Sequence, residues 1–175
     1  MTDPVAHGQR LAQPSAAFAG DHGEPDPAVR QAIAAATEQH GYLRAVAALC
    51  TTRLLMPIVA SGDESMAGPD PSRHAEMAAV KITAPDQTQA LLAFTGLDAL
   101  QAWQRGARPV PCTLDDLAAT VAESGASHLV LDVAGPQPFE LAPELLTELA
   151  QGRRLVELEP GEFGWMYLAE GARAG

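Results

Sequence analysis

The densest group of potential metal ligands in this sequence lies in a polar loop at about residues 62–75. Carboxylate and imidazole side chains occur in and beside it at Asp63, Glu64, Asp70, His74 and Glu76. Such donors suit divalent metals, but their spacing matches neither the glycine-containing loop of an EF-hand nor the histidine pairs of zinc enzymes. Polar loops of acidic proteins commonly have this composition, so we expect neither a metal nor another cofactor.

Nucleophilic and acid–base catalysis also lack a sequence signature. The chain has no Gly-x-Ser-x-Gly motif, and no basic residue flanks Cys50 or Cys112 to favour a thiolate. His128 and Asp132 are expected on one face of a strand, but their separation of roughly 13 Å along that strand excludes a direct proton relay. The turn containing Gly96 also lacks the other glycines of a dinucleotide fingerprint. We therefore expect the chain not to be an enzyme.

Arg108 and Asp132 form the charged pair with the clearest potential for recognition. Arg108 lies beside a strand stiffened by two prolines, and Asp132 ends the neighbouring strand that the crossover predicts. The guanidinium and the carboxylate could form a structural pair that fixes the turn after Asp132, or Arg108 could be presented to a carboxylate of a partner. Both interpretations remain open. The candidate partner-binding residues are Arg108, Pro109, Pro111, Asp132, Gly135 and Pro136.

Composition limits the possible partners and compartment. The 175 residues include 22 acidic and 11 basic side chains, with a net charge of −11. An acidic chain without a Lys/Arg cluster argues against nucleic acid and anionic membranes as partners. Two distant cysteines indicate free thiols in a reducing compartment, and no apolar run approaches the roughly 20 residues that span a bilayer. We therefore expect a cytoplasmic protein.

The N-terminal part of the chain predicts a tail followed by helices. Residues 1–25 show no helical or strand period, so we expect a disordered tail before a single domain at 26–175. Asp26 is a suitable N-cap, and its neighbour is a proline, which the first helical turn tolerates. We expect Gly41 to end this helix and a second helix to occupy residues 42–49.

The next segments predict strands. Residues 53–59 form an apolar run, and we expect an edge strand or a bulge there because Pro57 cannot donate a ladder hydrogen bond. Residues 77–83 and 89–94 predict an antiparallel hairpin with Asp86 in its turn.

From residue 95 the pattern alternates between strand and helix. We expect a helix at 96–105, beginning beside the hydroxyl of Thr95 and ending at Gly106, and a helix at 114–124. A central strand is expected at 128–133. The remaining expected elements are an extended segment at 108–112, a third helix with Pro143 in its first turn and Gly152 after its end, and a closing hairpin turning at Pro160-Gly161. Together these predict an α/β (α+β) fold, with one mixed β-sheet, helices packed on it and β-α-β crossovers in its middle.

Several short motifs resemble one known family over about residues 42–151. They are Glu76-Met77-Ala78, Phe94-Thr95, Ala99-Leu100, Trp103, Arg108-Pro109-Val110-Pro111, Leu131-Asp132 and Gly135-Pro136. In order and spacing they resemble the SseB protein N-terminal domain family, named for enhanced serine sensitivity. The resemblance implies a link to amino-acid metabolism, but it carries over no catalytic residue because the family has no established reaction.

These observations predict a non-enzymatic, cytosolic, SseB-like binding or regulatory module whose protein partner is unknown. Its recognition surface would lie at the loops 95–98, 108–113 and 132–138, because ligands of open α/β sheets bind near the carboxyl ends of strands. One alternative is a sensor or enzyme for a small metabolite, such as an amino acid or a cationic ligand. Another is a self-associating structural domain, a possible homodimer formed through 53–59 or the terminal hairpin.

Overall fold

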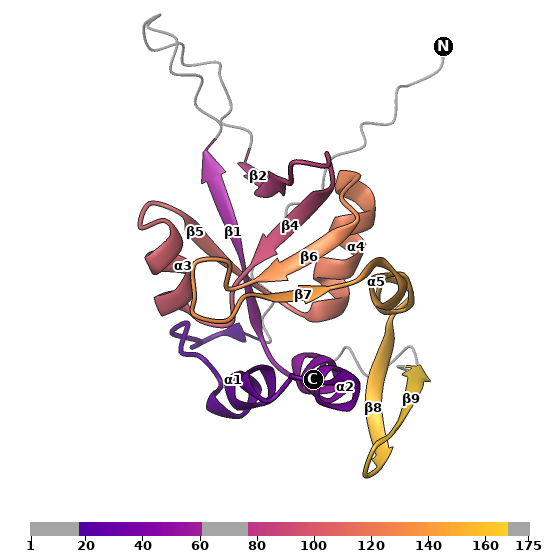
Figure 1. Cartoon of the computed structure of the whole chain (residues 1–175). Coiled ribbons are helices and arrows are strands. Elements are labelled where there is room, and N and C mark those ends of the chain that lie inside the picture. The colour runs from indigo at the N-terminus through magenta and orange to yellow at the C-terminus, as the bar shows by residue number, and fades with distance from the viewer. Residues whose placement is uncertain (1–17, 61–76, 168–175) are drawn as a thin grey trace, which may run out of the picture.

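A computed structural model describes residues 18–60 and 77–167 (Figure 1). The loop with the five potential metal ligands and the first 17 residues of the expected tail therefore lie outside the described residues. The described helices are α1 (Pro27–Ala34), α2 (Gln39–Leu49), α3 (Leu97–Trp103), α4 (Leu114–Ser124) and α5 (Pro143–Ala150). The strands are β1 (Leu54–Ala60), β2 (Met77–Ala79), β3 (Lys81–Thr83), β4 (Gln89–Ala93), β5 (Arg108–Cys112), β6 (His128–Leu131), β7 (Phe139–Leu141), β8 (Arg153–Glu159) and β9 (Glu162–Tyr167).

The fold is mixed α/β, but the prediction of a single sheet is wrong. The described strands form three sheets, in the orders β2-β1-β5, β3-β4-β6-β7 and β8-β9. The expected hairpin is present as β3 and β4. β4 and β6 run in parallel within one sheet, as expected, but they pair directly, whereas the predicted crossovers placed the 108–112 segment beside them. The strand between them in sequence, β5, instead leaves that sheet and pairs antiparallel with β1.

One extended segment links the two larger sheets. Its first half, β2, pairs with β1, and its second half, β3, pairs with β4. Between the halves, the carbonyl of Val80 accepts a hydrogen bond from the amide of Leu92. At the other end of β1, Leu55 and Phe94 exchange two backbone hydrogen bonds, so β1 and β4 meet there directly. The sheets therefore separate because β2 and β3 pair with different strands.

The backbone alternation of β1 explains how a central strand contains a proline. The backbone N–H and C=O groups of Leu55 point toward β4. Because these groups alternate in direction along a strand, the backbone of Pro57 also points away from β5. On that side, β1 is bridged to β4 at Leu55 and pairs with β2 from Ile58 onward. The missing N–H of Pro57 lies between these two neighbours. The expectation that this strand is an edge is thus wrong, because no ladder bond is required at Pro57.

The break between the first two helices precedes the predicted glycine. Asp26 caps α1 through its carboxylate, as expected, but α1 ends at Ala34. Gly41 lies inside α2, where a Cβ atom would stand 2.7 Å from the carbonyl oxygen of Ala35. This glycine permits the close approach of two chain segments and does not terminate a helix.

The core has two parts because β4 is buried on both faces. Leu91 contributes to a large cluster with α1, α2, α4 and α5, whereas Leu92 and Phe94 face a smaller cluster under α3. Figure 1 accordingly shows α3 on the opposite side of the strands from α4 and α5. Trp103 packs in the smaller cluster, with its ring 5.5 Å from that of Phe94.

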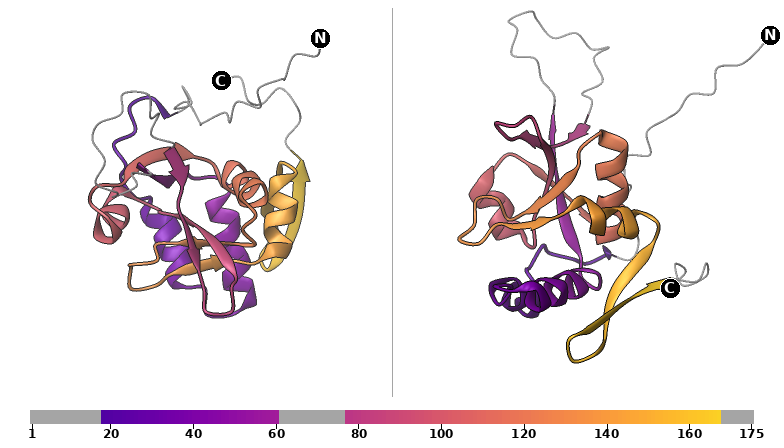
Figure 2. Two further views of the ribbon diagram at one scale, coloured as in Figure 1. Left: turned by 90° about the horizontal axis from the view of Figure 1, so that it is seen from above. Right: turned by 45° about the vertical axis from the view of Figure 1, so that its right-hand side comes forward.

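The closing hairpin extends along the side of the body (Figure 2). Leu155 of β8 belongs to the large core cluster, and Arg44 of α2 forms an ion pair with Glu157 at 2.6 Å. At the other end of the described chain, Asp21 forms an ion pair with Arg53 at 2.6 Å. The segment 18–25, which belongs to the expected tail, thus contacts the domain. No helix among the described residues is long and apolar enough to cross a membrane.

Candidate functional site

The carboxyl ends of the parallel strands β4 and β6 bring Thr95 and Asp132 together. The backbone N–H of Thr95 donates to Asp132 Oδ1 at 2.8 Å, and its hydroxyl donates to Oδ2 at 2.6 Å. Asp132 has a φ of 51°, in the left-handed region that aspartate tolerates better than most residues. Thr95 is 3% exposed, so the carboxylate satisfies two donors that are shielded from water.

Arg30 of α1 completes a network of charged groups. Its Nε donates to the hydroxyl of Thr95 at 3.0 Å, and its two terminal nitrogens bind the carboxylate of Asp98 at 2.6 and 2.7 Å. The Asp98 hydrogen bond raises the pKa of Arg30, and the same bond lowers the pKa of Asp98. Both groups therefore remain charged near neutral pH.

The start of α3 is shaped by this network. We expected the hydroxyl of Thr95 to cap the helix, but it binds Asp132 instead, and the N-cap is Gly96. A Cβ atom at Gly96 would lie 2.7 Å from Asp98 Oδ1 and 2.9 Å from Pro25 Cβ. The first amide of the helix, at Leu97, donates to the carbonyl of Gly23 at 2.7 Å. The segment 18–25 thus occupies the position of a capping group.

Beside the network is a hollow of about 390 Å³ between α1, α3 and the turn after β6, here called the α1–α3 hollow. Its charged lining residues are Arg30, Asp98 and Asp132, and its other lining residues are Ile33, Ala34, Ala99, Ala102, Ala134, Gly135, Pro136 and Gln137. The volume lies within the range of small-molecule sites. The site thus combines two carboxylates, one guanidinium and a mainly aliphatic wall.

Three of the predicted partner-binding residues line this hollow. Asp132, Gly135 and Pro136 belong to the turn after β6, which the amide of Gly135 closes by donating to the carbonyl of Asp132 at 2.8 Å. A Cβ atom on Gly135 would lie 3.1 Å from that carbonyl oxygen, which favours glycine there. These three residues thus form one side of the hollow.

The other three predicted residues lie elsewhere. Arg108, Pro109 and Pro111 belong to β5, which pairs with β1 in the other sheet. Arg108 is exposed opposite Ile58, and the described part of the chain contains no ion pair between it and Asp132. The expected structural pair is therefore wrong, because β5 does not lie beside β6.

Two prolines lie on β5, which is the outer strand of its sheet among the described residues. The backbone alternation set by Leu55 makes the N–H and C=O groups of Val110 point toward β1. The backbone groups of Pro109 and Pro111 therefore point away from β1. Both outward positions thus lack the N–H that an added strand would bind, which is a common defence against edge-to-edge pairing.

Catalytic and metal-binding arrangements are not found among the described residues. Cys50 and Cys112 are free thiols, as expected, and burial raises both pKa values, that of Cys112 to about 12. No group of three or more potential metal ligands occurs within 18–60 and 77–167. His128 lies at the start of β6. Its Nδ1 is 2.8 Å from the hydroxyl of Ser127, and its Nε2 is 3.5 Å from a carboxylate oxygen of Glu140.

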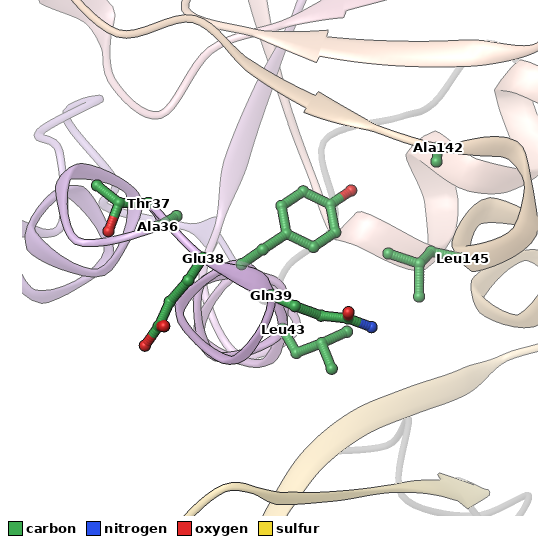
Figure 3. A pocket seen from close by; sticks show the side chains of 8 residues that line it. Ala36, Thr37, Glu38, Gln39, Leu43, Ala142 and Leu145 are labelled. Atoms are coloured by element: carbon green, nitrogen blue, oxygen red, sulfur yellow. The ribbon is translucent and has the colours of Figure 1, made fainter.

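A second hollow, of about 540 Å³, lies between the α1–α2 link and the start of α5 (Figure 3). Figure 3 shows Gln39 and Leu43 of α2 facing Ala142 and Leu145 across an open space. Its one charged lining residue is Glu38. This hollow lacks the converging charges of the α1–α3 hollow and is the weaker candidate.

Sequence reasoning missed Arg30 and Asp98. Thr95 follows the strand expected at 89–94, and Asp132 is near the end of the strand expected at 128–133. The parallel direction of those two strands was a usable signal that the two residues lie at the same edge of a sheet. Arg30 and Asp98 are 68 positions apart on separate helices, and no local pattern links them.

The chain matches one protein-family model. The model is described as SseB protein N-terminal domain, and residues 29–148 match it. The match begins within α1 and contains α3 and the turn after β6, and therefore every residue that lines the α1–α3 hollow, but it does not contain the β8–β9 hairpin. The curated proteins and the solved structures contain no match.

Proposed function

Because the chain belongs to the SseB protein N-terminal domain family, we propose that it is a non-enzymatic, cytosolic binding or regulatory module of that family. In this proposal the α1–α3 hollow receives part of a protein partner. The observation that carries the proposal is the convergence of Arg30, Asp98 and Asp132 on an aliphatic hollow at the carboxyl ends of β4 and β6. Ligands of open α/β sheets bind at such ends.

The absence of an enzymatic role is part of the proposal and rests on what the hollow contains. Arg30 and Asp98 are paired, and Asp132 accepts two hydrogen bonds from Thr95. An acid–base pair needs groups aimed at a reacting atom, whereas these groups are aimed at one another. The arrangement suits recognition of a surface better than turnover.

The test is affinity capture of partners from the native cell with the full chain. Ala102→Met should release a captured partner, because Ala102 lines the hollow on α3 and a longer side chain would fill it. Methionine favours helices almost as well as alanine, so folding should be kept. Arg108→Ala is the matched control, since it alters an exposed residue of the other sheet and should retain the partner. Loss with Arg108→Ala and retention with Ala102→Met would place the interface on β5 and reject the hollow.

The volume of the hollow also favours a second candidate, a sensor or enzyme for a small metabolite such as an amino acid or a cationic ligand. A hollow of about 390 Å³ can enclose such a molecule. Thermal-shift screening against amino acids and nucleotides separates the candidates. Saturable stabilisation that Ala102→Met abolishes would favour the metabolite.

Self-association is a third candidate, favoured by the exposed apolar side chains of the hairpin. Leu158, Met166 and Tyr167 are 65%, 52% and 68% exposed. Light scattering over a range of concentrations tests this candidate, and a constant monomer mass would reject it.

A further inference from the structure

We infer that the occupant of the α1–α3 hollow is a lysine or arginine side chain of the partner, presented by a basic segment. This inference rests on the proposed binding function and adds the chemistry of the partner. It follows from the charge balance of the hollow, the nature of its walls and the charge of the whole chain.

The charge balance favours a cation. Arg30 carries one positive charge, whereas Asp98 and Asp132 each carry a negative one. The guanidinium is matched to Asp98 by two hydrogen bonds, so its charge is neutralised locally. No ion pair joins Asp132 to a cation within the described residues, although Arg30 attracts its carboxylate at longer range. One negative charge of the three groups is therefore left over. An incoming carboxylate or phosphate would meet this excess negative charge, whereas an ammonium or guanidinium group would balance it.

The walls favour an aliphatic stem behind the charged head. Ile33 is a buried residue near the C-terminal end of α1. Ala99, Ala102 and Ala134 line the sides of the hollow with methyl groups. Lysine and arginine side chains commonly place their methylene groups along apolar surface while the charged head remains polar. An uncharged aliphatic side chain would fit these walls equally well, but it would remove water from the carboxylates without replacing their hydrogen bonds.

The exposed position of Asp98 supplies an accessible acceptor. Its side chain is 58% exposed although it is bound to Arg30. Each carboxylate oxygen can accept more than one hydrogen bond, so Asp98 can bind a second cation without releasing the first. The net charge of −11 would attract a basic segment from a distance and raise its association rate.

The experiment uses the full chain labelled with ¹⁵N and four capped tripeptides, Gly-X-Gly, in which X is lysine, arginine, norleucine or glutamate. Norleucine keeps the stem of lysine and lacks its charge. The lysine and arginine tripeptides should shift the amide resonances of Ala34, Ala99 and Gly135 saturably. The norleucine tripeptide should bind at least about tenfold more weakly, since it lacks the charge-assisted hydrogen bonds, and the glutamate tripeptide should leave the three resonances unshifted.

Two variants and one control locate the binding. Ala102→Met, which fills the hollow and keeps every charge, should weaken lysine tripeptide binding by about tenfold, as should Asp98→Asn. Glu123→Gln removes the same charge from the exposed surface of α4 and should change the affinity by less than about twofold. Equal effects of Asp98→Asn and Glu123→Gln would mean diffuse charge attraction and would overturn the inference. Unshifted hollow resonances at about 10 mM lysine tripeptide would also overturn it.

Failure of this inference is distinguishable from failure of the proposed function. If Ala102→Met releases a captured protein while the lysine tripeptide leaves the hollow unshifted, the binding module stands and the basic occupant is wrong. If the lysine tripeptide binds in the hollow while Ala102→Met retains every captured protein, the basic occupant stands and the protein-binding role of the hollow is wrong.

Discussion

Thr95 offers both its backbone N–H and its hydroxyl to the carboxylate of Asp132, 37 positions later in the chain. The two hydrogen bonds join the ends of the parallel strands β4 and β6 and fix the turn that forms one wall of the α1–α3 hollow. The same hydroxyl accepts a hydrogen bond from Arg30, so this side chain also links the strand ends to α1. The side chain of Thr95 therefore holds together the strand ends, the turn that lines the hollow, and α1.

Replacing Asp132 by alanine should destabilise the fold by about 3 kcal/mol. The change removes two hydrogen bonds to a charged acceptor and places alanine at a φ of 51°. Asp132→Asn should cost about half as much, because asparagine tolerates this φ and keeps one acceptor oxygen. Urea unfolding measures both values, and an alanine variant as stable as the wild type would contradict the structure.

The Arg30–Asp98 pair should make a small, pH-dependent contribution to stability. The pKa of Asp98 is lower in the folded chain than its ordinary value of 3.8, so the contribution is present above that value and is lost as the pH falls through the folded pKa. The side chain of Asp98 is 58% exposed, so solvent screening limits the pair to less than about 1 kcal/mol.

A double-mutant cycle with Arg30→Gln and Asp98→Asn measures that coupling. Urea unfolding near neutral pH should give a favourable interaction energy that disappears in strong acid. An interaction energy that does not change with pH would rule out an ionic origin.

Glu157 on β8 should titrate with a pKa of about 2. The hydrogen bond from Arg44 is the main cause, and the amide of Gly161 adds to it. Carboxyl NMR titration should show the pKa rising toward its ordinary value of 4.5 in Arg44→Gln. The contribution of this pair to the docking of the hairpin is full above that ordinary value and is lost as the pH falls toward 2. An unchanged pKa in Arg44→Gln would show that the hairpin does not contact α2 through this pair.

Neither cysteine should react with a thiol reagent in the native protein. Burial raises the pKa of Cys50 and that of Cys112, the latter to about 12, so the thiolate fraction near neutral pH is very small. Ellman's reagent should label both thiols only after unfolding in urea. Rapid labelling of the folded chain would place a cysteine at the surface.

Replacing both outward prolines of β5 should promote self-association. Pro109→Thr with Pro111→Thr would create two N–H donors on the outer side of β5, which is an edge strand among the described residues. Light scattering should then show a higher mass at raised concentration. Val110→Thr is the matched control because the N–H of Val110 faces β1. Equal masses for the wild type, the double proline variant and Val110→Thr would show that the two prolines do not prevent pairing at this edge.

Local features of the fold were predictable because a few neighbouring residues decide them. Asp26 caps α1, Thr113 and Asp116 form a capping box on α4, and Gly125 ends that helix in the left-handed conformation. Asp86 accepts a hydrogen bond from the amide of Thr88 in the β3–β4 turn, and Gly161 turns the closing hairpin at a φ of 84°. Helix caps and turns depend on side chains within about four positions of each other.

The sequence by itself therefore determined most of the elements, although not β7, together with the β3–β4 hairpin and the parallel direction of β4 and β6 within one sheet. It also selected Asp132, Gly135 and Pro136, which line one wall of the hollow. Only the tertiary structure decided that β5 leaves this sheet for β1, which separates Arg108 from Asp132. It also decided that Arg30 reaches Asp98, 68 positions away. Such contacts depend on how whole strands and helices pack, and many packings are compatible with the same local preferences.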